Sequence, residues 1–411
     1  MSSDAATDPA PFSLFEGDWL NRVYAALGVG KYSRFALLKR CALVILLTWV
    51  PVAALAWWQG FGGGGRVATN FFADFAAYAQ FLLGMPLFIL AEPIIDSSTR
   101  RAGQQFVSCG VIRPEDRHRL SELHARIAGL RKCRGVDVVC IVLAYSLSLV
   151  ILVPEFRAHA PITWHLHTYC LGGSCWRTLS LAGAWEFLVA LPLLDYTWLR
   201  FGWKIFLWIY YLYGVSRTRL ALHATHPDLV GGVGFISSTQ SHFAIFILAY
   251  GISNIVSTVG YEITILGYGI STLTVWGPLV GFGIGAPLLF VLPLFMFTRQ
   301  LYHCKQRALM IYRQRVTEHS QQVENRWLVQ DRAPQSAADE IRDLTELSTL
   351  GTMFTRIQGM RVVPFDLTSF SQLVGSSFGS IATLLPLLHV SGRVTGVFDA
   401  LGKILGHLGG H

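Results

Sequence analysis

Long uncharged apolar runs dominate this chain and limit what it can fold into. The 411 residues are 52% hydrophobic and only 14% charged, whereas soluble domains carry about a quarter charged residues. A run of about 20 apolar residues is long enough to cross a bilayer as a helix. The composition therefore predicts an all-α, polytopic transmembrane helical bundle surrounded by a lipid bilayer.

The apolar runs divide the chain into six predicted spans and the segments that connect them. We expect an N-terminal lead at 1–40, a six-span domain at 41–298 with an interfacial helix at 113–133, a cytoplasmic helical region at 299–361 and an amphipathic tail at 391–411. Phe12 to Leu27 is expected to lie on the bilayer as an amphipathic segment. Residues 367–390 carry no formal charge and predict a seventh span, or alternatively a re-entrant segment.

The basic residues set the predicted orientation. The formal net charge is +8, and Lys and Arg gather beside the spans on one side, which is the positive-inside pattern of cytoplasmic loops. The N-terminus is therefore predicted to be cytoplasmic. Because these basic residues lie between spans and not on a free surface, we expect no nucleic-acid partner.

Two acidic residues lie inside the predicted fourth span, which begins near Leu181. Glu186 and Asp195 interrupt an otherwise apolar run, and an uncompensated carboxylate at membrane depth costs several kcal/mol. They are nine residues apart, which puts them on roughly opposite faces of a helix. They indicate either an ion path or structural ion pairs with neighbouring helices.

Arg200 and Lys204 follow on one face of the same helix, among several aromatic residues. One interpretation is that both side chains snorkel to the interface through an aromatic belt. The other is a ring of positive charge that selects anions at the mouth of a pore.

Small residues at a spacing of four predict close helix packing. They occur in the sixth span and in the segment at 367–390, at Gly277, Gly281, Gly285, Gly375 and Gly379. Such contacts form within one subunit or between subunits, and we expect a homo-oligomer.

Cys170 and Cys175 are the two cysteines that this topology places outside the cell. Their spacing, with Gly-Gly-Ser between them, predicts a disulfide hairpin in an oxidising compartment. The neighbouring His159, His165 and His167 leave a copper or zinc site open as an alternative, although the spacing matches no recognised zinc pattern. We expect neither a resident metal nor a cofactor.

A second set of polar residues lies in the loop after the fourth span. His226-Pro227-Asp228 precedes a Gly-Gly-Val-Gly-Phe segment at 231–235, and the simplest interpretation is a turn with Asp228 as a local cap. A metal site that uses His223, His226 and Asp228 is an alternative. No strand precedes the glycines and no Gly-Lys-Ser/Thr follows, which argues against a phosphate-binding loop.

The same loop carries a resemblance to an uncharacterised family of bacterial polytopic inner-membrane proteins. The matching residues are Arg200, Trp203, Thr225 to Asp228, Gly231 to Phe235 and, further along, Met360 to Phe365. The resemblance implies the inner (plasma) membrane of a bacterium. It implies no activity or ligand.

Three functions are compatible with these features. The first is an oligomeric channel or transporter for a small ion, with Glu186 and Asp195 on the path and Arg200 and Lys204 tuning selectivity. The second is a membrane scaffold or sensor that signals through its cytoplasmic helices. The third is a membrane-embedded enzyme, which no catalytic motif supports. Acids that face a hydrated cavity favour the first, and acids neutralised in a dry bundle favour the second.

Overall fold

The computed structural model describes residues 12–15, 22, 24, 26, 28, 33–62, 70–156, 163–171, 174–265, 273–325 and 337–386. Its helical segments are α2 (Arg34–Trp58), η2 (Phe71–Ala73), α3 (Phe75–Ala77), η3 (Tyr78–Gly84), α4 (Met85–Ser108), η4 (Pro114–Asp116), α5 (Arg117–Arg131), α6 (Arg134–Glu155), α7 (Leu181–Trp185), η5 (Glu186–Ala190), α8 (Leu191–Ser216), α9 (Phe235–Ser241), α10 (Ala244–Tyr250), η6 (Gly251–Val256), α11 (Ser257–Thr264), α12 (Leu273–Val291), η7 (Leu292–Phe297), α13 (Thr298–Glu324), α14 (Ala337–Gly359) and α15 (Leu367–Ala382). The strands β1 (Leu166–Leu171) and β2 (Ser174–Leu179) form an antiparallel hairpin.

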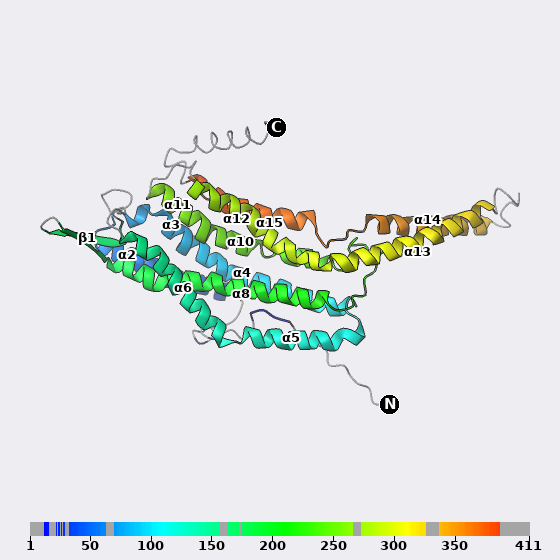
Figure 1. The fold of residues 1–411 in the computed structure, drawn as a ribbon, viewed down its shortest axis with the longest axis horizontal. Coiled ribbons are helices and arrows are strands. Elements are labelled where there is room, and N and C mark those ends of the chain that lie inside the picture. The colour runs from blue at the N-terminus through cyan, green and yellow to red at the C-terminus, as the bar shows by residue number, and fades with distance from the viewer. Residues whose placement is uncertain are drawn as a thin grey trace, which may run out of the picture.

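Five helical stretches in the described part of the chain are long and apolar enough to cross a membrane. They are Arg34–Trp58, Phe75–Ser108, Arg134–Glu155, Phe235–Thr264 and Leu273–Glu324. The predicted fourth span falls in α7, η5 and α8, which run alongside these helices (Figure 1). It is not among the five because Glu186 and Asp195 lower its hydropathy. The predicted fold, an all-α polytopic helical bundle, is confirmed.

Some helices are longer than a membrane is thick. The helix from Phe75 to Ser108 has 34 residues, which corresponds to about 51 Å, whereas the hydrocarbon core is about 30 Å thick. The bundle thus continues past its apolar layer at the end opposite β1 and β2. We call the end that carries β1 and β2 the strand end. We call the opposite end, from which two long helices project, the arm end. At the arm end α5 lies beside α8 (Figure 1) and buries Leu120 and Ile127. The helix predicted at 113–133 thus packs against the end of α8, and its position at the membrane interface stays a prediction.

Two long helices project from the arm end. Helices α12, η7 and α13 form one continuous stretch of 52 residues, and α14 packs back along α13 (Figure 1). We call α13 and α14 the arm. Nε2 of His319 on α13 lies 3.8 Å from Oε2 of Glu346 on α14. The arm falls within the helical region predicted at 299–361.

Two spans cross at stretches of π-helix, where a residue is locally inserted into the helical repeat. In η3, a Cβ on Gly84 would lie 2.4 Å from the Cβ of Ser253 in η6. Gln80 also donates a hydrogen bond to Oγ of Ser257 at 3.3 Å. The Ser257 hydroxyl in turn donates to the Ser253 carbonyl at 2.6 Å. Glycine and serine therefore allow close contact while keeping the polar groups of the π-turn bonded.

Close packing also occurs at a glycine outside the predicted small-residue stripes. A Cβ on Gly251 would lie 2.2 Å from Oγ of Ser380 and 2.8 Å from the ring of Phe282. The five predicted packing glycines differ from Gly251. A Cβ built on four of them meets no neighbouring atom of the described residues within 4 Å, and a Cβ on the fifth meets only the side chain of Leu273, at 4.0 Å. The four are Gly281, Gly285, Gly375 and Gly379, and the fifth is Gly277. Among the described residues these five glycines make no close contact with a neighbouring helix, and their predicted role in packing, including contact between subunits, stays a prediction.

Two predictions reach residues outside the described ranges. Helix α15 covers only the first part of 367–390, so a spanning or re-entrant path stays a prediction. It buries Ser369, Leu373 and Ser377. In the β hairpin Cys170 pairs with Cys175 across the two strands. Their side chains lie outside the described part of the chain, so the disulfide also stays a prediction.

The N-terminal segment predicted to lie on the bilayer instead enters the bundle. Phe12–Phe15 is buried, and the Phe12 ring stacks on Tyr211 of α8 with centroids 4.3 Å apart. Oδ1 of Asp96 on α4 accepts a hydrogen bond from the Leu14 backbone N–H at 3.2 Å, and the Lys204 ammonium on α8 donates to the Leu14 carbonyl at 2.8 Å. The segment is drawn inward because it supplies hydrogen-bond partners for two buried charges.

The contrast between the glycines predicts that Gly251→Ala destabilises the protein and Gly281→Ala does not. Adding a methyl group at Gly251 overpacks the contact with α15, which costs about 1 to 3 kcal/mol. The same change at Gly281 meets open space within the chain. Unfolding in mixed micelles measures both. Equal destabilisation by the two changes would contradict this packing and would place Gly281 in a contact between subunits.

Candidate functional site

Glu186 belongs to a buried ionic cluster at the strand end. Its Oε2 lies 3.0 Å from Nε2 of His165. The other ring nitrogen, Nδ1, donates to both carboxylate oxygens of Glu155, each at 2.9 Å. The histidine thus bridges carboxylates from two helices, the end of α6 and the start of η5. We call Glu155, His165 and Glu186 the acid–histidine cluster.

Further side chains complete the hydrogen bonding of Glu155. The Tyr261 hydroxyl on α11 donates to Oε1, and the Thr163 hydroxyl donates to Oε2, both at 2.9 Å. Arg177 on β2 donates to the Glu155 backbone carbonyl at 2.8 Å. Another buried carboxylate lies close by, because Asp74 accepts from the indole N–H of Trp164 at 3.0 Å. The cluster therefore joins α6, α7, α11 and the β hairpin.

Local sequence explains how His165 reaches the helix. Ser180 caps α7 by accepting from the Gly183 N–H, and its hydroxyl donates to the Trp164 carbonyl, both at 2.9 Å. A Cβ on Gly183 would lie only 2.4 Å from the carbonyl oxygen of His165. Only glycine at this position lets the loop lie directly on the helix, next to Glu186.

The charges of the cluster depend on one another. Burial alone would lower the pKa of His165, but the carboxylates of Glu186 and Glu155 outweigh it and hold the pKa well above its usual range. The imidazole is therefore protonated at neutral pH. The imidazolium is then buried between two carboxyl groups, each within hydrogen-bond distance of one of its ring nitrogens.

Asp195 lies in different surroundings from Glu186. Its Oδ1 accepts a hydrogen bond from the indole N–H of Trp198, one turn along α8, at 3.0 Å. Its Oδ2 is buried and accepts no hydrogen bond from the described residues. The two acids of the predicted span are therefore not brought into one site.

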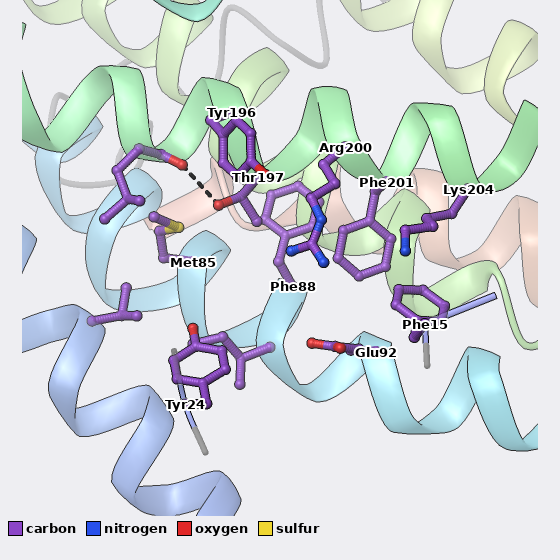
Figure 2. A pocket seen from close by; sticks show the side chains of 13 residues that line it. Phe15, Tyr24, Met85, Phe88, Glu92, Tyr196, Thr197, Arg200, Phe201 and Lys204 are labelled. Carbon is purple, nitrogen blue, oxygen red and sulfur yellow. Dashed lines mark hydrogen bonds between the residues drawn. The ribbon is translucent and has the colours of Figure 1, made fainter. Parts of the chain in front are cut away.

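Arg200 and Lys204 line a small enclosed cavity of about 40 Å³ nearer the arm end. Figure 2 shows both side chains pointing from α8 toward Glu92 on α4. The Lys204 ammonium also lies 4.9 Å from the centre of the Phe15 ring. Among the described residues the N-terminal segment thus covers Lys204, and both cations are buried. Their predicted role in ion selectivity stays a prediction.

Three residues of the buried sites give only weak signals in the sequence. Glu155 follows a proline at the end of a span, and Asp74 begins a helix, so both resemble ordinary helix-end residues in the sequence. His165 stood out only as an alternative metal ligand. Both of its ring nitrogens contact carboxylates, and among the described residues no group of three or more His, Cys, Asp or Glu side chains is arranged to hold a metal ion.

The loop after α8 is organised by Asp228. Its carboxylate accepts hydrogen bonds from the backbone N–H groups of Val230, Gly232 and Gly234 at 2.9 to 3.1 Å. Oδ1 also lies 2.8 Å from Nδ1 of His226. Burial by itself would raise the pKa of Asp228, but these hydrogen bonds hold it below its usual range. Gly231 and Gly232 have φ values of +72° and +94°, which L side chains rarely adopt.

This loop fixes the base of the arm. The Arg361 N–H, just after α14, donates to the Leu229 carbonyl at 2.7 Å. The Lys305 ammonium on α13 donates to the Met360 carbonyl at 2.6 Å. Met360 also lies next to Gly231. The loop residues thus connect α8 to both helices of the arm, and His223 and His226 do not combine with Asp228 into a metal site among the described residues.

Fold and site together define a class: an all-α integral membrane protein with buried ionic clusters and a projecting helical arm. No protein-family model matches the chain, and no curated protein or solved structure is significantly similar to it.

The acid–histidine cluster predicts that the protein becomes less stable as the pH rises into the alkaline range. Because the folded-state pKa of His165 is raised, its stabilising effect is complete below about pH 6.5, the usual value. It is lost as the pH rises through the folded-state pKa. We expect the thermal unfolding midpoint to fall over this alkaline range, and His165→Gln to remove much of that dependence. His118→Gln, an exposed histidine on α5, is the control. An unchanged pH profile in His165→Gln would contradict the assignment.

Proposed function

We propose that this protein is a membrane sensor that passes the state of its strand end to the arm, with the arm in the cytoplasm. The observation that carries this proposal is the acid–histidine cluster, in which Glu186 in η5 is paired with His165 inside the protein. An open ion path would instead need that acid to face water.

The interior around the charged residues is compact. The cavity beside Arg200 and Lys204 has a volume of about 40 Å³, enough for one or two water molecules. Glu186 is buried against His165. Such an interior is suited to changing shape when a buried ion pair changes, because packed cores move between discrete arrangements.

One continuous piece of structure joins the two ends. Helices α7, η5 and α8 begin beside the cluster and run to Ser216 at the arm end. The Asp228 loop then bonds to the segment that ends α14. A shift of Glu186 relative to His165 would thus act on the arm through packed and hydrogen-bonded elements.

The arm has the surface expected of an output element. Four of its large apolar side chains are exposed: Met310 by 75%, Ile311 by 48%, Ile341 by 65% and Leu344 by 48%. Basic residues at its base, among them Arg299, Lys305 and Arg307, favour a cytoplasmic location by the positive-inside rule.

Proton-coupled transport is the second candidate, and one observation favours it. The Glu155–His165–Glu186 arrangement places three titratable groups in direct hydrogen-bond or ion-pair contact. Glu186 also shares one continuous helix with Arg200 and Lys204. A proton relay needs such neighbours, together with water access that opens in another conformation.

The sensor proposal predicts that Glu186→Gln alters hydrogen–deuterium exchange in the arm. The change removes the charge that faces His165, so the strand end rearranges and peptides from α13 and α14 exchange at a different rate. The measurement uses the full-length protein in nanodiscs at constant pH. Glu262→Gln, a carboxyl-to-amide change elsewhere at the strand end, is the matched control and should resemble wild type.

A second variant tests the path. Asp228→Asn removes part of the loop's hydrogen bonding, so Glu186→Gln made in this background should no longer change arm exchange. Arm exchange that is identical in wild type and folded Glu186→Gln would rule out the sensor. Proton flux into liposomes that Glu186→Gln abolishes would favour the transport candidate instead.

A further inference from the structure

A wide basic groove at the arm end adjoins the loop of Asp228 and is distinct from the acid–histidine cluster. It has a volume of about 820 Å³, within the range of small-molecule sites. The basic and titratable side chains that line it come from three parts of the chain. They are Arg113, Arg217, Arg219, His223, His303 and Arg307.

The four arginines of this groove have no acidic partner. The lining contains no carboxylate, and none of the four forms a salt bridge with a described residue. Asp116, which is bonded to the Arg219 backbone N–H at 3.1 Å, already pairs with Arg119 at 3.3 Å. Clustered like charges without counter-ions are unfavourable, so an anion would stabilise this end of the bundle.

Hydrogen bonds hold the floor of the groove in place. Gln300 on α13 donates to the carbonyls of Ser216 and Thr218 at 2.6 and 3.0 Å, and its side-chain oxygen accepts from the Leu220 N–H at 3.4 Å. Leu220 also forms a β-bridge with Ile112, next to Arg113. The arginines therefore project from connected segments, so that the backbone of the groove is already ordered before a ligand binds.

The chemistry of the lining identifies the class of ligand. Guanidinium groups bind phosphate oxygens through paired N–H donors. The wall formed by Ala308, Ile311 and Tyr312 offers apolar and aromatic surface beside this charge. We propose that the groove binds a phosphate-bearing anion with an apolar or aromatic portion. Two sources share this chemistry, a soluble nucleotide and an anionic phospholipid whose headgroup reaches the end of the spans.

The test compares two arginine-to-glutamine pairs in the full-length protein. Arg219→Gln with Arg307→Gln removes two groove cations. Arg299→Gln with Arg313→Gln removes two exposed cations of α13 that do not line the groove, so the loss of net charge is matched. Circular dichroism verifies that both variants fold.

Two binding experiments distinguish a soluble ligand from a lipid. In phosphatidylcholine nanodiscs, calorimetry measures binding of inorganic pyrophosphate and of ADP. In nanodiscs that also contain phosphatidylglycerol, native mass spectrometry measures the lipid retained. We expect wild type and the control pair to bind alike, and the groove pair to bind about tenfold more weakly for each arginine removed. Binding in the first experiment assigns a soluble phosphate ligand. Binding only in the second experiment assigns a lipid headgroup. If no probe binds, or if both variant pairs weaken binding equally, the proposal is wrong.

Discussion

The ion pairing of Glu186 with His165 is the interaction on which the strand end depends. A lone carboxylate in the apolar part of the bundle would be strongly destabilising. His165 neutralises it and at the same time contacts Glu155 at the end of α6. The histidine reaches this position because Gly183 lets the loop lie directly on α7. One buried charge thus determines where the connecting loop must lie and which helices must meet there.

The same requirement shapes the other end of the bundle. Lys204 is buried on α8, and the backbone of the N-terminal segment provides its hydrogen-bond acceptor. Asp96 binds that segment from α4. At the base of the arm, the Asp228 carboxylate gathers backbone N–H groups of its own loop. In each case a charged group is paired with backbone groups of a segment outside the regular helices and holds that segment against the bundle or in its turn.

The sequence predicts the helical membrane bundle well because long apolar runs have few alternatives to crossing a bilayer. It also predicts that Glu186 and Asp195 do not form one site, since nine residues separate them along a helix. The partners of Glu186 could not be predicted, because Glu155 and His165 lie in other segments and meet it only through tertiary contacts. The glycine that packs most closely within the chain could not be predicted either. The regular spacing of Gly277, Gly281 and Gly285 carries no information on which face meets a neighbour, whereas Gly251 has no such pattern and makes the tight contact.

The most direct test of this account is a double-mutant cycle on the free energy of unfolding, with Glu186→Gln, His165→Gln and the two combined. If the pair stabilises the strand end as described, His165→Gln removes the positive charge that faces Glu186, and Glu186→Gln removes one of the two carboxylates that face His165. The double variant then loses less than the sum of the two, by about 1 to 3 kcal/mol. Additive losses would show that the two side chains do not interact in the folded protein, and the account of the strand end would be wrong.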